Sequence, residues 1–229
     1  MSFYFGITLE SHTIMVSDRR RSYPDGRPPD DSSSKIWKIR DDFYLTAAGL
    51  LPFAESLVAD CRQVLKTQPL DFAALKRDGV SWRDFFYKGY KDLDQRVITQ
   101  ATAEGWDPTI QREQITSLLF GGIDVQETPF FLAFNSRDGF EPQPIEGKFA
   151  LAMLETIPDP HKIRNISEAI AERVRLLSKM PAVEALKKAL EVLPEVVSLV
   201  RKEDDSVGPT CDVAIIAQSR SEVHTRGVP

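Results

Sequence analysis

The residues with the clearest capacity for chemistry lie at the start of the chain. Ser2 directly follows Met1, so removal of Met1 would leave a hydroxyl and a free α-amine on the same residue. A serine hydroxyl is a poor nucleophile until a base takes its proton. An α-amine, with a pKa of about 7.7–8.0, can serve as that base near neutral pH. Together these groups predict a self-activating amide hydrolase, although many proteins begin with Met-Ser.

Three further residues fall near the ends of short strand-like segments and would complete such a site. The positive charge of Lys35 would hold the terminal amine neutral, and Asp18 would fix that lysine as an ion pair. Gly49 would present a backbone N–H to the oxyanion, and its lack of a side chain leaves room for substrate. Taken alone, each residue fits an ordinary structural role better: a strand-terminal charge, a solvated lysine and a strand-to-helix break.

Hydrophobic periodicity predicts the elements that must position these groups. Strands are expected at 3–9, 12–18, 35–39, 43–48, 115–123, 129–134, 148–154, 212–218 and 221–226. Helices are expected from Pro52 to about residue 67 and at 71–77, 82–103, 163–177 and 183–200. Pro194 should kink or shorten the last helix because its ring removes a backbone donor. Paired helices between blocks of antiparallel strands indicate an α+β fold with stacked sheets and helices outside them.

Composition limits the class of protein. The chain has 229 residues, 42% hydrophobic and 28% charged, which suits one compact domain over 1–229 with no linker. The net charge of −5 argues against a general nucleic-acid binder. The run Arg19–Arg21 is expected to form local ion pairs, and Cys61 and Cys211 to be buried hydrophobes. With no leader and no long apolar run, we expect a cytoplasmic protein without membrane contact.

Several segments resemble one known family. Phe5–Leu9 followed by Ile14–Arg20 looks like the opening of proteasome β-type subunits, which are N-terminal-nucleophile hydrolases. Ser2 then falls on the family's N-terminal threonine. Lys35–Ile39 resembles the strand with the catalytic lysine, Thr46–Leu50 the segment with the oxyanion-hole glycine, Leu119–Asp124 the central Gly-Gly-x-Asp strand and Asp212–Ile216 the closing strand.

This resemblance implies the four-layer αββα sandwich of N-terminal-nucleophile hydrolases and a peptidase activity. Its catalytic residues would be Ser2, Asp18, Lys35 and Gly49, with substrate bound by Ala47, in a roomy S1 pocket, and by Arg21. It implies peptide substrates, no cofactor or metal, and a homo-oligomeric ring or related assembly, whereas an ATPase partner stays open. Trimming of Met1 without a propeptide is closest in style to the bacterial ancestral-β-subunit branch.

Two regions depart from the family pattern. The family's Ser-Gly-Ser segment, which hydrogen-bonds the terminal amine, is matched here by the apolar Leu151–Leu154. The family's later Asp/Ser cluster is approximated by Asp204–Gly208, where Asp204, Asp205 or Ser206 could contact the amine. Two alternatives to a peptidase therefore remain: a catalytically inactive assembly subunit, and an acylase acting on small-molecule amides.

Overall fold

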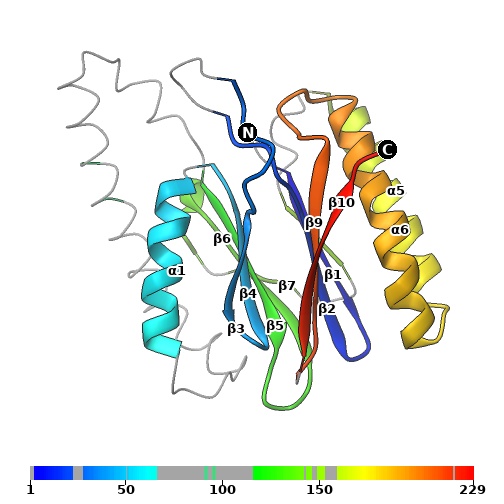
Figure 1. Ribbon diagram of the computed structural model, residues 1–229, viewed down its shortest axis with the longest axis horizontal. Helices are drawn as coiled ribbons and strands as arrows, with labels where there is room; N and C mark the ends of the chain where they lie inside the picture. Colours follow the sequence, from blue (N-terminus) through cyan, green and yellow to red (C-terminus); the bar gives the residue numbers. More distant parts are fainter. Residues whose placement is uncertain are drawn as a thin grey trace.

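Two antiparallel sheets form the centre of the protein, seen in a computed structural model (Figure 1). The structure describes residues 3–22, 28–49, 51–65, 116–141, 143–145, 149–152, 159–218 and 220–229, together with Lys91 and Gln95. In this part of the chain each sheet has five strands. The strand order is β10-β9-β2-β1-β8 in the first sheet and β3-β4-β5-β6-β7 in the second.

The first sheet joins the two ends of the chain, and the second is built from consecutive strands. The first contains β1 (Tyr4–Leu9), β2 (His12–Asp18), β8 (Phe149–Ala152), β9 (Thr210–Ile216) and β10 (Ser221–Gly227). The second contains β3 (Ile36–Arg40), β4 (Phe43–Ala48), β5 (Ser117–Ile123), β6 (Pro129–Asn135) and β7 (Gln143–Ile145). The helices are α1 (Leu51–Leu65), α5 (Pro160–Leu177) and α6 (Ala182–Arg201), with a short 3-10 helix η1 (Ser136–Asp138).

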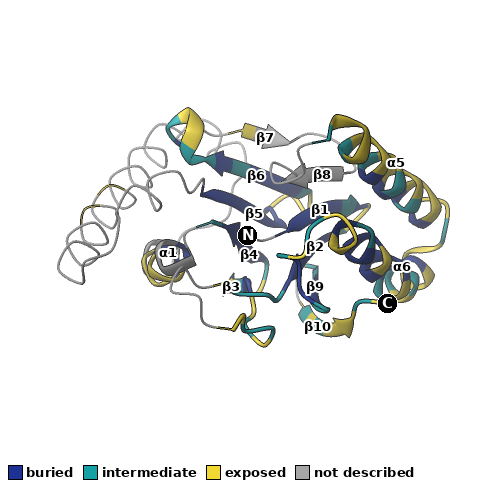
Figure 2. Cartoon of the chain, turned by 90° about the horizontal axis from the view of Figure 1, so that it is seen from above, coloured by how far each residue is buried: buried dark blue, intermediate teal, exposed yellow. Residues whose placement is uncertain are grey.

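Apolar side chains separate these elements into layers. Alternate residues of both sheets, such as Tyr4, Met15 and Leu119, form a cluster between the two sheets. The opposite face of the first sheet packs against α5 and α6, and that of the second sheet packs against α1. Figure 2 shows α1 and the α5–α6 pair on opposite sides of the sheets. The expected α+β architecture, with two antiparallel sheets and helices outside them, is confirmed.

One aromatic ring fills the space between the sheets at two glycines. Gly6 lies on β1 and Gly121 on β5, and both face Phe131 of β6. A Cβ atom at Gly6 would lie 2.4 Å from Cζ of Phe131, and one at Gly121 would lie 2.7 Å from Cε1. Close-packed interiors leave no space for such overlap. Both positions therefore require glycine for as long as the phenyl ring occupies this place.

The predicted strands and the helices at 163–177 and 183–200 are present, with boundaries shifted by a few residues. Of the two effects expected of Pro194, a kink or a shortened helix, the shortening is wrong, because α6 continues beyond it to Arg201. Burial of one long face of α6, Pro194 included, offsets the lost backbone hydrogen bond. The helices expected at 71–77 and 82–103 lie outside the described residues, apart from Lys91 and Gln95. Within the described residues, no helix combines the length and hydropathy needed to cross a membrane.

Strand β7 was not expected from the sequence. It has three residues, Gln143–Ile145, and carries a proline at its centre. Its pairing with β6 at the edge of the second sheet explains how Pro144 is tolerated, since an edge strand can leave one side of its backbone unpaired.

Candidate functional site

The centre of the candidate site is a buried ion pair between Asp18 and Lys35. Nζ of Lys35 lies 2.9 Å from Oδ2 and 3.1 Å from Oδ1 of Asp18. Both side chains are fully buried. Asp18 ends β2, and Lys35 immediately precedes β3, so two strand ends from different sheets meet here. The ion pair expected from the sequence is present.

Backbone groups from three segments also hold the carboxylate of Asp18. The N–H of Phe3 donates to Oδ1 at 2.7 Å, while the N–H groups of Arg20 and Gly208 donate to Oδ2 at 2.9 and 3.4 Å. In return, the N–H of Asp18 donates to the carbonyl oxygen of Phe3 at 3.0 Å. A buried carboxylate needs such donors to offset its lost hydration. Asp18 is therefore held against the residue that directly follows Ser2 in the chain.

Ser2 and Met1 themselves lie outside the described residues. The residue that follows Ser2 in the sequence is Phe3, whose backbone is hydrogen-bonded to Asp18 in both directions. The role of Ser2 stays a prediction.

Burial changes the acid–base chemistry of the lysine. Desolvation disfavours the ammonium form and lowers the pKa of Lys35 below its ordinary value of 10.5, whereas the charge and hydrogen bonds of Asp18 oppose that shift. Desolvation is the larger of these effects. The neutral amine of Lys35 is therefore reached at a lower pH than that of an exposed lysine.

This shift predicts how stability changes with pH. Between the lowered pKa of Lys35 and 10.5, the unfolded chain holds a proton that the folded chain has released, so the free energy of unfolding should rise with pH. Below the lowered pKa both states are protonated, and the full penalty of burying the ammonium is present. Urea unfolding should be measured for the wild type and Lys35→Met from neutral pH to about pH 10. As the pH rises, the free energy of unfolding of the wild type should increase relative to that of Lys35→Met. A pH-independent difference would contradict the lowered pKa.

The arginine run after Asp18 forms ion pairs, as predicted, but its partners are not local in sequence. Each arginine joins the end of β2 to a different part of the fold. Arg19 pairs with Asp212 of β9 at 2.7 Å, Arg20 with Asp31 of the loop before β3 at 2.7 Å, and Arg21 with Glu55 of α1 at 3.3 Å. The three arginines therefore connect the end of β2 to β9, to the loop before β3 and to α1.

Arg20 makes a bidentate ion pair. Its Nε and Nη2 atoms donate to the two carboxylate oxygens of Asp31 at 2.7 and 3.0 Å, the two-pronged geometry that makes such pairs strong. Its Nη1 donates to the carbonyl oxygen of Asp205 at 2.6 Å. The side chain of Arg20 thus bonds both the loop that leads to Lys35 and the 204–208 segment. The sequence analysis assigned no role in the site to Arg20, Asp31 or Gly208. The arginine run before the 22–34 loop and the acidic pair within it could have indicated a contact between Arg20 and Asp31.

Arg21, predicted to bind substrate, has its backbone engaged. Its N–H donates to the carbonyl oxygen of Asp30 at 2.7 Å, and its own carbonyl oxygen accepts from the N–H of Asp30 at 2.9 Å. A substrate strand therefore cannot pair with these backbone groups, and only the side chain of Arg21, which contacts Glu55, is left for that role. Substrate binding by Arg21 stays a prediction.

The two remaining predicted residues lie at the end of β4. Gly49 has φ of 92°, in the left-handed region that favours glycine, where the chain turns from β4 towards α1. Ala47 is buried in the cluster between the second sheet and α1. Gly49 is therefore placed at a strand end as expected, and the oxyanion and S1 roles of the two residues stay predictions.

The 204–208 segment contacts Asp18 through Gly208 and carries one buried hydroxyl. The N–H of Ser206 donates to Oδ1 of Asp204 at 2.8 Å, and two residues later Gly208 contacts Asp18. Oγ of Ser206 is buried and has no hydrogen-bond partner among the described residues. The carbonyl of Asp205 is occupied by Arg20. Of the three candidates for contact with a terminal amine, Ser206 therefore has an unused polar atom.

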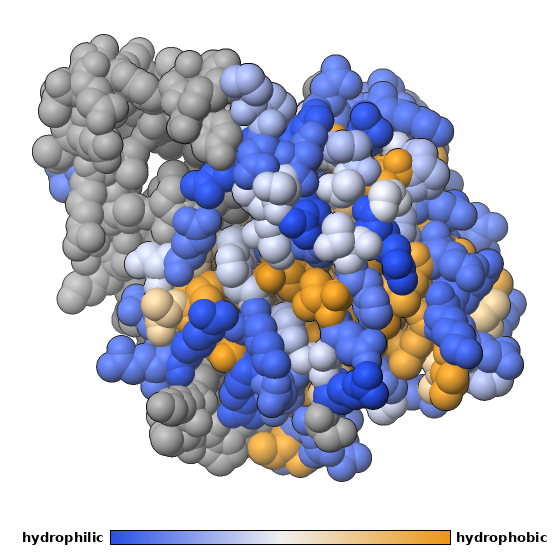
Figure 3. Space-filling view, in the orientation of Figure 1, coloured by the Kyte–Doolittle hydropathy of each residue, from blue (hydrophilic) through white to orange (hydrophobic). Residues whose placement is uncertain are grey.

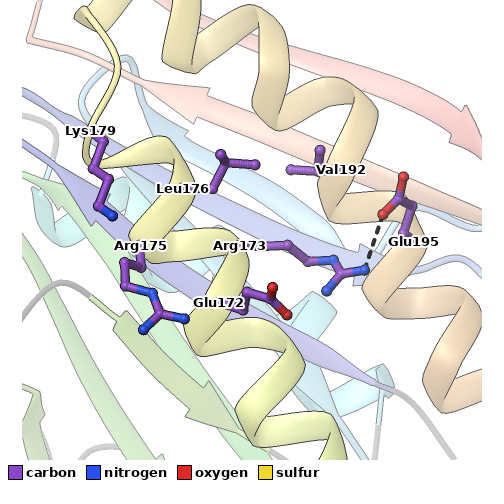
Figure 4. Close-up of a pocket in the computed structure, with 7 residues that line it drawn as sticks. All are labelled: Glu172, Arg173, Arg175, Leu176, Lys179, Val192 and Glu195. Atoms are coloured by element: carbon purple, nitrogen blue, oxygen red, sulfur yellow. Dashed lines mark hydrogen bonds and ion pairs between the residues drawn. The ribbon is translucent and has the colours of Figure 1, made fainter.

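A groove outside the candidate site is lined mainly by charged side chains. It lies between α5 and α6, with a volume of about 460 Å³ (Figure 4). Arg173 points across it to Glu195, with Nη2 and Oε2 3.1 Å apart. The other lining residues are Glu172, Arg175, Leu176, Lys179 and Val192. None of these residues belongs to the Asp18–Lys35 site. The face of the protein seen in Figure 3 is mainly hydrophilic, with small hydrophobic areas.

Comparison with known proteins adds no assignment: neither the protein-family models nor the curated proteins give a match to this chain. Within the described residues, no group of three His, Cys, Asp or Glu side chains could hold a metal ion. Interpretation of the site therefore depends on its geometry and on the resemblance of its motifs.

Proposed function

We propose that the protein is an N-terminal-nucleophile hydrolase of the proteasome β type that cleaves peptide bonds with Ser2 after removal of Met1. The observation that carries this proposal is the buried Lys35–Asp18 pair, bonded to the backbone of Phe3. A fully buried lysine is costly to keep unless its charge is used or compensated. The stacked antiparallel sheets with helices on both outer faces fit the αββα sandwich of that class.

The mechanism follows from these groups. Oγ of Ser2 attacks the substrate carbonyl carbon while the α-amine of the same residue accepts the hydroxyl proton. The charge of Lys35, oriented by Asp18, keeps that amine neutral beforehand. The N–H of Gly49 stabilises the oxyanion. Collapse breaks the C–N bond, and the leaving amine takes the proton from the α-ammonium group.

An acyl-enzyme ester on Ser2 remains, and water completes the reaction. The α-amine, neutral again, accepts a proton from the water as its oxygen attacks the ester carbonyl. The C–O bond to Ser2 then breaks, the serine oxygen regains the proton, and the carboxylic acid product leaves. No metal or organic cofactor is required for these steps.

An inactive assembly subunit is the second candidate. On the side away from β2, β1 pairs with β8, whose sequence Phe149–Ala152 contains no hydroxyl group and whose Ala152 is the register partner of Tyr4 on that side. A terminal amine would find no side-chain donor or acceptor on those four residues. In this candidate the Lys35–Asp18 pair would be structural, and Met1 would be retained.

Mass spectrometry distinguishes the two candidates. The purified protein should lack Met1 and gain one adduct from a β-lactone or epoxyketone probe, whereas Ser2→Ala should gain none. Peptide hydrolysis by Ser2→Ala should fall by about a thousandfold or more. Ser11→Ala, at the exposed turn between β1 and β2, is the matched control and should behave as the wild type.

Three outcomes would count against the peptidase. An intact Met1 would favour the assembly subunit, because a blocked amine cannot act as the base. Labelling that persists in Ser2→Ala would place the nucleophile elsewhere. Cleavage of acylamides but not of peptides, in a panel of both, would favour the small-molecule acylase.

A further inference from the structure

Hydrogen bonds cross the apolar layer between the two sheets at both of its ends. The hydroxyl of Tyr4 on β1 donates to Oγ of Ser117 on β5 at 2.8 Å. The hydroxyl of Thr13 on β2 donates to the carbonyl oxygen of Gly122, also on β5, at 2.7 Å. All three side chains are buried, so both bonds form in a medium of low polarity where geometry is strongly enforced.

The Tyr4–Ser117 bond lies at the end of the layer that carries the candidate site. Ser117 is the register partner of Ala48, the residue directly before Gly49. Tyr4 stands two residues after Ser2 in the sequence, and its own register partner is Ser17, the residue before Asp18. This bond therefore connects the strand that leads from the nucleophile to the strand pair that presents Gly49.

The Thr13–Gly122 bond lies at the other end. Gly122 is the register partner of Phe43, the first residue of β4, and Thr13 pairs with Thr8 near the β1–β2 turn. The two bonds thus cross the same layer between the same sheets and both end on β5. They differ in their distance along the strands from Asp18 and Gly49, and Thr13 is for this reason a matched control.

We propose that Tyr4 is a positioning residue, whose hydrogen bond to Ser117 sets the position of the start of β1, which directly follows Ser2 and Phe3 in the sequence, relative to the end of β4 and Gly49. This inference rests on the proposed function. Apolar packing holds the sheets together without fixing their sliding to within a fraction of an ångström, whereas a directional bond does. Catalysis needs that precision, because a displacement of 1 Å can cost about a hundredfold in rate.

The test compares Tyr4→Phe with Thr13→Val, each of which removes one hydroxyl and keeps most of the side-chain volume. Both variants should show decreased urea midpoints, because each loses a buried hydrogen bond between the sheets. For a fluorogenic peptide amide, kcat of Tyr4→Phe should fall roughly tenfold with KM unchanged, and β-lactone acylation should slow equally. Thr13→Val should keep the kcat of the wild type. Equal losses of kcat in the two variants, or a normal kcat in Tyr4→Phe, would overturn the proposal.

Ser117→Ala completes a double-mutant cycle. If Tyr4 acts through Ser117, the Tyr4→Phe/Ser117→Ala protein should be no slower than either single variant. Additive losses would show that Tyr4 acts by another route and would overturn the inference. A wild type that neither hydrolyses peptides nor reacts with the probe would overturn the proposed function itself. An active wild type with an unaffected Tyr4→Phe variant would overturn this inference alone.

Discussion

Lys35→Met is expected to abolish peptide hydrolysis and to lower the free energy of unfolding by about 3–5 kcal/mol, the cost of leaving a buried charge without its partner. The charge left behind is the carboxylate of Asp18, which would retain only its backbone donors. Asp18→Asn alone should be destabilised for the converse reason, because it strands the ammonium of Lys35. Urea unfolding and β-lactone labelling measure the two effects separately.

The double variant Asp18→Asn/Lys35→Met distinguishes a structural role of the ion pair from a catalytic one. It contains neither charge, so its loss of stability should be smaller than the sum of the single losses. Its activity should nevertheless stay absent, since no cation remains to keep the terminal amine neutral. If activity returned together with stability, the ion pair would have a structural role only, and the proposed mechanism would be wrong.

Gly208→Ala is expected to reduce hydrolysis at least tenfold and to destabilise the fold by about 1–3 kcal/mol, as overpacking does. The added Cβ would lie 2.9 Å from Cβ of Arg20, 3.0 Å from its backbone nitrogen and 3.1 Å from Oδ1 of Asp31. Because the N–H groups of Arg20 and Gly208 both bond Asp18, relief of this clash must shift the carboxylate's supports.

Gly227→Ala provides the control for that variant. Gly227 ends β10, and a Cβ there would meet nothing within 4 Å. Its peptide hydrolysis and urea midpoint should therefore match those of the wild type. If Gly208→Ala were equally active, Arg20 and the 204–208 segment would not determine the geometry at Asp18.

Much of the fold could be predicted because its strands are short, regular and strongly patterned. Phe3, Phe5, Ile7 and Leu9 alternate along β1, and two-residue turns at Glu10-Ser11 and Asp41-Asp42 fix which strands pair. The positions of Asp18 and Lys35 at strand ends followed from these boundaries. Their ion pair was one possibility at these positions, and the resemblance to proteasome β-type subunits favoured it over ordinary structural roles.

Hydrogen bonds inside the apolar layer between the sheets, and ion pairs between distant strands of one sheet, could not be predicted, because no periodicity relates residues so far apart. Tyr4 and Ser117, on different sheets, are separated by 113 positions, and Arg19 and Asp212, at neighbouring strands of the first sheet, by 193. A tyrosine in an apolar strand and a serine at the start of another give no sign of each other. The bonds of Arg21 with Asp30 were likewise hidden, since the backbone of one loop supplies them. Sequence patterns specify an element's inward face but not the partner that it meets.

The ring of Phe131, wedged against Gly6 and Gly121, restricts how this protein can diverge. A methyl group at either glycine demands a smaller residue at 131, and that smaller residue leaves a void beside the other glycine. Single replacements are therefore penalised, while a coordinated exchange at all three sites is tolerated. Related sequences should therefore either keep Gly6, Gly121 and Phe131 or replace all three together, even where their surface residues differ.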